Sequence, residues 1–312
     1  MKTYAPNYYE KFRCIAGECR HSCCIGWDVY IDDETLEKYD TLGGETGKVL
    51  RSQLTEKEDG VCLAMCEGGK CPMLNTQGLC QIILEHGESY ISEICREHPR
   101  FYNFFSDRTE VGLGLSCEEA ARIILSQEEK TELTVVSEDE AEEEELWDDE
   151  ADILVKRAQI FDALQNRGES LSARAEKMLS VCGAHFPEKT AAEWAEIFRS
   201  LEMLDESWAD ALDMLEHADM SAEMEELALP LEQLLVYFVY RHTPEAADER
   251  DFAARVAFAH LGFTVIRALC AAKKAASGKC TLAYLCDFAR RYSAEIEYSP
   301  ENTYELIEIM EV

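Results

Sequence analysis

The sequence lacks the apolar stretches that a membrane span or a secretory signal would need. Its first ten residues, MKTYAPNYYE, contain neither the apolar region nor the small-residue cleavage site of a signal peptide. The longest apolar run, residues 227–240, is interrupted by Pro230 and Glu232 and is too short to cross a bilayer. These absences predict a cytoplasmic protein without membrane contact, in a compartment that keeps thiols reduced.

Basic residues are also scarce. The chain has 30 Lys and Arg against 63 Asp and Glu, which gives a formal net charge of −33. Residues 1–125 carry 13 basic and 21 acidic side chains (−8), and residues 126–312 carry 17 and 42 (−25). Because nucleic-acid binding needs clustered positive charge, we expect no nucleic-acid partner. The acidic surface serves solubility, or attracts a lysine-bearing protein.

Two common cofactor motifs are missing as well. No G-x-G-x-x-G sequence follows a predicted strand, so the usual dinucleotide-type loop is absent. The C-x3-C-x2-C motif of radical S-adenosylmethionine enzymes is incomplete, because Cys19-x3-Cys23 is followed by Gly26 at the third position. If the protein uses S-adenosylmethionine, it therefore binds it through neither of these two standard motifs.

Cysteine, by contrast, is abundant and concentrated near the N-terminus. Of 14 cysteines, 10 precede residue 118, and four lie within the run CIAGECRHSCC that begins at Cys14. Such dense clusters bind metal or form disulfides, and reducing conditions favour metal. We expect the ligands among eight thiols: Cys14, Cys19, Cys23, Cys24, Cys71, Cys80, Cys95 and Cys117.

The spacing of these thiols leaves the metal open, because zinc and iron–sulfur clusters both take four such ligands. Ser116 and Glu119 form a capping-box pattern, which predicts Cys117 in the first turn of a helix. Cys62 and Cys66 lie in a strand-like stretch and are expected to be peripheral. Ordinary core or surface thiols are expected at the remaining positions, Cys182, Cys270, Cys280 and Cys286.

The chain divides by composition into three parts and is predicted to be mainly α. Residues 1–126 form a Cys-rich, loop-rich metal-binding domain with short strands. Residues 137–150 contain ten acidic side chains in fourteen, so we expect an acidic linker over 127–150. Residues 151–312 carry helical patterns throughout, which predicts an all-α bundle of six or seven helices. Clear helix starts are the capping box of Thr190 with Glu193, and Ser299-Pro300.

Several motifs in residues 1–125 together resemble the flagellin lysine-N-methylase (FliB) family. They also resemble the wider group of proteins with a zinc- or iron-chelating CxxCxxCC domain. The motifs are Tyr4-Ala-Pro-x-Tyr8, Cys14-x4-Cys19-x3-Cys23-Cys24-x2-Trp27, Cys71-Pro-x-Leu-x4-Leu79-Cys80, Cys95-x2-His98-Pro99-Arg100 and Gly112-Leu-Gly-Leu-Ser-Cys117-Glu118. The extra thiols Cys62 and Cys66 and the wider C-x4-C-x3-CC spacing depart from that group's pattern.

The resemblance implies methyl transfer from S-adenosylmethionine to lysine side chains of flagellin. It further implies an iron–sulfur cluster of the 4Fe-4S type, held by the N-terminal cysteines, with zinc as the alternative metal.

Methyl transfer requires groups that stabilise the cationic methyl donor. It also requires a base that takes a proton from the lysine amine. Residues 100–110 supply aromatic and acidic side chains between two candidate ligands, and we expect Tyr102, Asp107 and Glu110 to form the catalytic pocket. His98 is a candidate ligand or base, and Arg100 a candidate for holding the donor's carboxylate. An ordinary structural role is favoured for His98, and it explains the other four residues equally well.

Two further functions fit the cysteine pattern. One is a zinc- or iron-chelating protein without catalysis, which would load metal reversibly and ignore S-adenosylmethionine. The other is a zinc-stabilised adaptor whose acidic half binds a basic partner in a salt-sensitive way.

Overall fold

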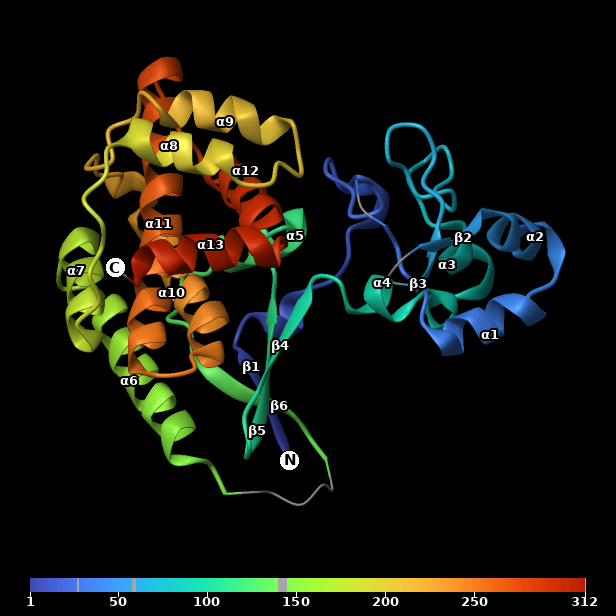
Figure 1. Ribbon diagram of the computed structural model, residues 1–312, viewed down its shortest axis with the longest axis horizontal. Helices are drawn as coiled ribbons and strands as arrows, with labels where there is room; N and C mark the ends of the chain where they lie inside the picture. Colours follow the sequence, from blue (N-terminus) through green and yellow to red (C-terminus); the bar gives the residue numbers. More distant parts are fainter. Residues whose placement is uncertain (27, 58–59, 140–144, 312) are drawn as a thin grey trace. The chain divides into compact units, whose positions relative to one another are not determined.

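The computed structural model describes residues 1–26, 28–57, 60–139 and 145–311 (Figure 1). The chain forms two compact units, and the first is discontinuous in sequence. It contains residues 1–12 together with 101–312, whereas the second contains residues 13–100. We call them the helical unit and the cysteine unit.

The cysteine unit is built from short elements around a small apolar core. Asp32 begins helix α1 by accepting a hydrogen bond from the Thr35 amide at 3.0 Å, and its other carboxylate oxygen accepts the Glu93 amide at 2.8 Å, which ties α1 to α4. The elements are α1 (Asp33–Thr41), α2 (Gly44–Gln53), β2 (Leu54–Lys57), β3 (Gly60–Leu63), α3 (Gln81–His86) and α4 (Glu93–Glu97), with 3-10 turns at Ala16–Glu18 and Glu88–Tyr90.

The helical unit contains a four-stranded sheet in the order β4-β5-β1-β6. Its central strand β1 pairs in parallel with β5 and antiparallel with β6, so that Tyr4 lies opposite both Glu110 and Val135. The strands are β1 (Lys2–Pro6), β4 (Arg100–Phe104), β5 (Arg108–Leu113) and β6 (Leu133–Glu138), and a 3-10 turn follows β1 at Tyr9–Lys11.

The core of this unit lies around two helices. α10 (Ala228–His242) is buried almost all round, and α11 (Glu249–Ser277) has its middle fully buried, with Gly262 placing its backbone against the Phe238 ring. α11 is long and apolar enough to cross a membrane, but 78% of its apolar window is buried in the fold. Around them lie α5 (Glu118–Leu125), α6 (Asp148–Leu164), α7 (Leu171–Cys182), α8 (Ala191–Ser200), α9 (Ser207–Leu215), α12 (Leu282–Tyr292), a π-helical turn (Ser293–Glu297) and α13 (Pro300–Met310), with 3-10 turns at Glu225–Leu227 and Thr243–Glu245.

The mainly helical character expected from the sequence is confirmed. The helix starts at Thr190 and Ser299 are also confirmed, because both side chains cap the amide three residues ahead. Within the described residues the chain after Asp148 forms eight α-helices, more than the six or seven expected. Cys117 is the N-cap of α5 rather than a residue of its first turn, since Glu119 pairs with Arg122 instead of closing a capping box.

The expected boundaries at 126 and 150 do not coincide with the two units. Strand β1 finds its hydrogen-bond partners in β5 and β6, so the N-terminal residues join the helical unit. The expected linker of residues 127–150 contains strand β6 and the first turn of α6. Its residues 140–144 lie outside the described part of the chain.

Candidate functional site

Four of the eight expected ligand thiols lie close together in the cysteine unit. Cys71, Cys80 and Cys95 pack against the core formed by residues such as Tyr39 and Met73. The Cys71 amide donates to the Cys24 carbonyl at 2.9 Å, which brings the first and second cysteine groups side by side. Electrostatic interactions join Cys71 with the other three thiols of this set, which we call the thiol array: Cys24, Cys71, Cys80 and Cys95.

Turns and helix ends hold the thiol array in place. Asn75 accepts the amides of Gln77 and Leu79 on its side-chain oxygen, closing the loop between Cys71 and Cys80. Cys80 then forms the N-cap of α3, where nearby backbone amides favour a thiolate. The structure therefore brings Cys24, from the first cysteine group, next to Cys71, from the second, and a turn joins Cys71 to Cys80.

Burial gives the thiols of the array different acidities. It raises the pKa of Cys71 to about 12 and that of Cys95 to about 11, and it also raises the pKa of Cys80. A hydrogen bond with Cys23 lowers the pKa of Cys24 to about 7. Three buried thiols that resist ionisation by themselves would become thiolates only beside a positive charge, which a metal centre supplies.

The donor set suits soft metal chemistry, since four thiolates are the usual ligands of zinc and of iron–sulfur clusters. Among the described residues, however, no three His, Cys, Asp or Glu side chains gather as closely as a single metal ion requires. The thiol array is thus a set of neighbouring thiols with the right chemistry that does not form a compact single-ion site among the described residues.

The other four expected ligands lie outside this set, although Cys23 hydrogen-bonds to Cys24. Cys14 is exposed and its sulfur accepts the Ala16 amide at 3.4 Å. Cys23 is exposed beside Cys24, and Cys19 belongs to the loop that precedes it. Cys117 belongs to the helical unit, where it caps α5.

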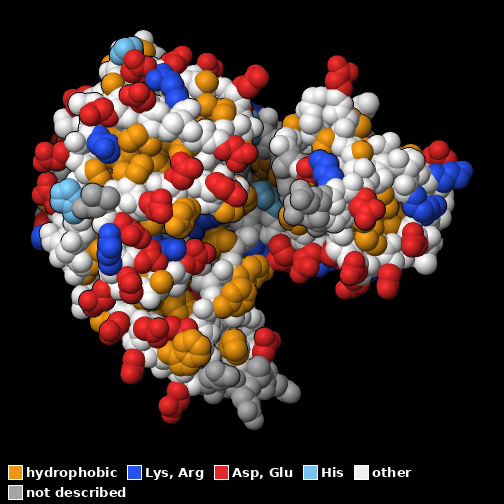
Figure 2. Space-filling view, viewed as in Figure 1, with side chains coloured by type: hydrophobic (Ala, Val, Ile, Leu, Met, Phe, Trp, Pro, Cys, Tyr) orange, Lys and Arg blue, Asp and Glu red, His pale blue; other side chains and the backbone are white. Residues whose placement is uncertain are grey.

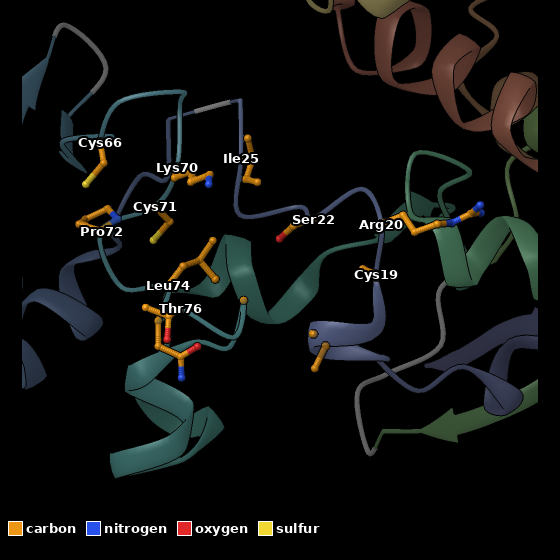
Figure 3. A pocket seen from close by; sticks show the side chains of 14 residues that line it. Cys19, Arg20, Ser22, Ile25, Cys66, Lys70, Cys71, Pro72, Leu74 and Thr76 are labelled. Carbon is orange, nitrogen blue, oxygen red and sulfur yellow. The ribbon is translucent and has the colours of Figure 1, made fainter.

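A cavity of about 400 Å³ opens beside the array within the cysteine unit (Figure 3). Cys66, Lys70 and Cys71 lie near one another at its edge, on the loop that leads to Pro72. Cys19 and Arg20 also line it. Cys66 therefore borders this cavity, whereas the other extra thiol, Cys62, is buried in strand β3.

Glu110 lies inside the helical unit rather than in an open pocket. It is fully buried, and its two carboxylate oxygens accept hydrogen bonds from Arg157 on α6 at 2.8 and 2.6 Å. The Arg157 guanidinium also lies over the Tyr240 ring at 5.5 Å. This bidentate ion pair joins the sheet to the helices and occupies the oxygens that a base would need.

Tyr102 and Asp107 have separate partners. Tyr102 is 41% exposed on strand β4 and stacks on the ring of Phe104, which is 77% exposed. Asp107 accepts two hydrogen bonds from Arg108, at 2.8 and 2.7 Å, and this interaction lowers the pKa of the Asp107 carboxyl. Asp107 is therefore an ionised carboxylate next to a short aromatic surface.

His98 and Arg100 lie at the end of the cysteine unit. His98 follows α4 and precedes a cis peptide bond to Pro99. Burial lowers the pKa of His98 to about 4, so its imidazole is neutral near pH 7 and protonation of the ring is disfavoured. Arg100 donates to the Arg96 carbonyl at 3.1 Å.

A buried polar network in the helical unit was not predicted from the sequence. Glu297, on the π-helical turn, accepts the Tyr237 hydroxyl at 2.9 Å and lies 2.7 Å from His242 and 3.3 Å from Arg241. The sequence contained a signal for this network, because Tyr237, Arg241 and His242 bring three polar groups to the end of an apolar run. Their spacing places them together on one helix end.

Comparison with known proteins identifies relatives of the C-terminal half. Residues 188–312 match the family described as the FliB lysine N-methylase C-terminal domain. The chain is 27% identical over 127 residues to the lysine-N-methylase of Salmonella typhimurium, an alignment that covers 39% of this chain and 32% of that protein. It is 26% identical over 127 residues to the flagellar biosynthetic protein FliU of Salmonella muenchen, covering 39% of this chain and 75% of FliU. No solved structure matches.

The alignments cover about a third of the length of the Salmonella lysine-N-methylases.

Proposed function

Residues 188–312 place this chain in the FliB family of lysine N-methylases, and on that premise we propose that it methylates lysine side chains of flagellin. The match to the C-terminal domain carries this proposal. The proposed methyl donor is S-adenosylmethionine, and the proposed location is the cytoplasm, where thiols stay reduced.

The reaction exchanges one bond for another. The lysine nitrogen forms a bond to the donor's methyl carbon while the carbon–sulfur bond breaks, and its electron pair stays on the sulfur of neutral S-adenosylhomocysteine. The amine must lose a proton, because its ordinary pKa is about 10.4 and the ammonium has no free electron pair. A base or water takes that proton.

The expected pocket residues differ in how well their surroundings suit this chemistry. We assign Glu110 a structural role, because Arg157 holds both of its oxygens. Arg108 likewise holds both oxygens of Asp107, whereas Tyr102 offers an exposed ring that favours a cation. Burial disfavours a proton on the His98 imidazole, so we assign His98 no role as the base.

We further propose that the thiol array holds an iron–sulfur cluster. A cluster of several irons keeps its thiolates farther apart than a zinc ion, whose sulfurs lie about 2.3 Å from the metal. Four neighbouring thiols, Cys24, Cys71, Cys80 and Cys95, are the donor set that such a cluster takes. Such a cluster supplies one-electron transfer at a potential set by burial and by hydrogen bonds to its sulfurs.

The first test combines metal analysis with methyl transfer. The full chain, purified without oxygen, should contain iron and acid-labile sulfide and should transfer labelled methyl groups to flagellin. Cys95→Ser should lower bound iron severalfold, since Cys95 belongs to the thiol array. Cys66→Ser is the matched control, because this exposed thiol lies in the same unit outside the array.

Each part of the proposal can fail separately. Zinc without sulfide in the purified chain would refute the cluster and favour a chelating or adaptor role. Iron loading with no methyl transfer to flagellin would refute the methylase assignment for this substrate. Equal iron in Cys95→Ser and Cys66→Ser would refute the choice of ligands.

A further inference from the structure

The helical unit contains a second cavity, of about 490 Å³, far along the sequence from the thiol array. This volume lies in the range of small-molecule sites. The cavity is formed where the start of α7, the first turns of α10, the segment before α10 and the middle of α11 come together. Charged side chains that line it are Arg167, Arg174, Arg267, Glu169, Glu223, Glu225 and Glu232.

Positive charge is in excess among the buried residues of this cavity. Arg174, Arg267 and Glu232 are all more than nine-tenths buried. Two arginines share the Glu232 carboxylate, because it forms an ion pair with Arg174 and a second one with Arg167 at 2.9 Å. One buried carboxylate thus faces two buried guanidinium groups and a third at the edge.

Arg267 has no carboxylate of its own within ion-pair distance in the described part of the chain. Its guanidinium donates to the Met220 carbonyl at 2.8 Å and to the Ser172 hydroxyl at 3.1 Å. The Nε–H groups of Arg267 and Arg174 are buried, and among described residues neither has a hydrogen-bond partner. A buried cation with unused donors is the usual partner of a carboxylate or another anion. Burial lowers the pKa of Arg267, and an anion would offset that effect.

The rim of the cavity has the opposite charge. Glu223 and Glu225 are exposed, and Glu223 accepts a hydrogen bond from Ser172, the same hydroxyl that accepts Arg267. A ligand that fits both the interior and the rim of the cavity must therefore carry a negative group at its inner end and a positive group at its outer end. A simple anion would satisfy the interior but meet two carboxylates on entry.

We propose that this cavity binds a small molecule with an α-amino-carboxylate end, its carboxylate against Arg267 and Arg174 and its ammonium against Glu223 and Glu225. Two sources share this chemistry, a free amino acid and the methionine end of S-adenosylmethionine. The cavity itself is independent of the proposed function. Its identification as the methyl-donor site rests on that function.

The test uses calorimetry on the full chain with three probes. These are S-adenosylhomocysteine, L-methionine, and 3-(methylthio)propionate, which keeps the thioether and the carboxylate of methionine but is one carbon shorter and lacks the ammonium. We expect an amino-acid probe to bind at least tenfold more tightly than the propionate. Arg267→Lys keeps the buried charge but loses the planar fork, and it should weaken binding about tenfold. Glu223→Gln should weaken the amino-acid probes but not the propionate.

A matched control is Arg250→Gln, since Arg250 is exposed on the same helix and pairs with Glu311. It should bind all probes as the unchanged chain does. If S-adenosylhomocysteine binds and methionine does not, the ligand is the methyl donor. If both bind, the cavity recognises the amino-acid end that they share. Equal affinity for the propionate, no binding of any probe, or full binding by Arg267→Lys would overturn the proposal.

The outcome is separable from that of the proposed function. Tight S-adenosylhomocysteine binding that depends on Arg267, together with no methylation of flagellin, keeps the site and refutes the flagellin methylase. Methylation with an unchanged donor KM in Arg267→Lys keeps the methylase and refutes this cavity as its methyl-donor site.

Discussion

Replacing Glu110 by Gln should destabilise the helical unit without being a catalytic defect. The change keeps the shape of the side chain but leaves Arg157 buried, 4% exposed, without its carboxylate. Removing one partner of a buried ion pair costs about 3–5 kcal/mol. With a urea dependence of about 2–3 kcal/mol per molar, the unfolding midpoint should fall by about 1–2 M.

Far-ultraviolet circular dichroism during urea unfolding measures this shift, because the helical unit holds most of the long helices. The control is Glu249→Gln, which removes an exposed partner from Lys156, the neighbour of Arg157 on α6, and should leave the midpoint close to unchanged. The double change Glu110→Leu with Arg157→Leu should recover much of the loss, since apolar replacement of a whole buried pair is often tolerated.

One result would contradict the structural role assigned to Glu110. If Glu110→Gln unfolds at the normal urea concentration but loses methyl transfer, the carboxylate acts in catalysis and the reasoning from its two hydrogen bonds is refuted. A loss of transfer that follows only the fraction of unfolded protein supports the structural role.

Two other changes test the interior of the helical unit. Burial raises the pKa of Glu297, but the charge of Arg241 and the hydrogen bond with His242 together hold it at about 2. Because the folded pKa is below the unfolded value of 4.5, this group contributes stability above about pH 4.5 that is lost as the pH falls toward 2. Glu297→Gln should lower the urea midpoint at neutral pH and flatten its decline in acid, and an equally steep decline would contradict this. Gly262→Ala should lower the thermal midpoint, because its new Cβ would lie 2.8 Å from the Phe238 ring; an unchanged midpoint would mean that the ring moves freely.

Local sequence patterns predicted the helices of the C-terminal half well. The capping box at Thr190 and the N-cap at Ser299 act through atoms three residues away, so a short window contains all the information. The sheet was missed because its strands are held by distant partners, with Tyr4 opposite Glu110 and Val135. No local signal shows that residues 2–6 belong with residues 108–138.

The candidate site was predicted in part for the same reason. The sequence identified eight thiols, but only folding shows that Cys71 reaches Cys24 and that Cys117 belongs to another unit. Glu232 and Arg267 were visible as charges within apolar helical patterns. Their common cavity depends on the packing of α7, α10 and α11, which periodicity alone does not specify.

The face of the molecule in Figure 2 shows acidic side chains over much of its surface, in keeping with the charge counted from the sequence. A lysine-bearing partner should therefore associate faster at low salt.

The discontinuous helical unit also sets an order of events during synthesis. Residues 13–100 leave the ribosome as a complete unit while β1 still waits for β5 and β6, which end at Leu113 and Glu138. Units that are contiguous in sequence can fold as they emerge, whereas a sheet with a late strand cannot. The cysteine unit can therefore fold on the nascent chain, before the larger unit that encloses it in sequence has closed.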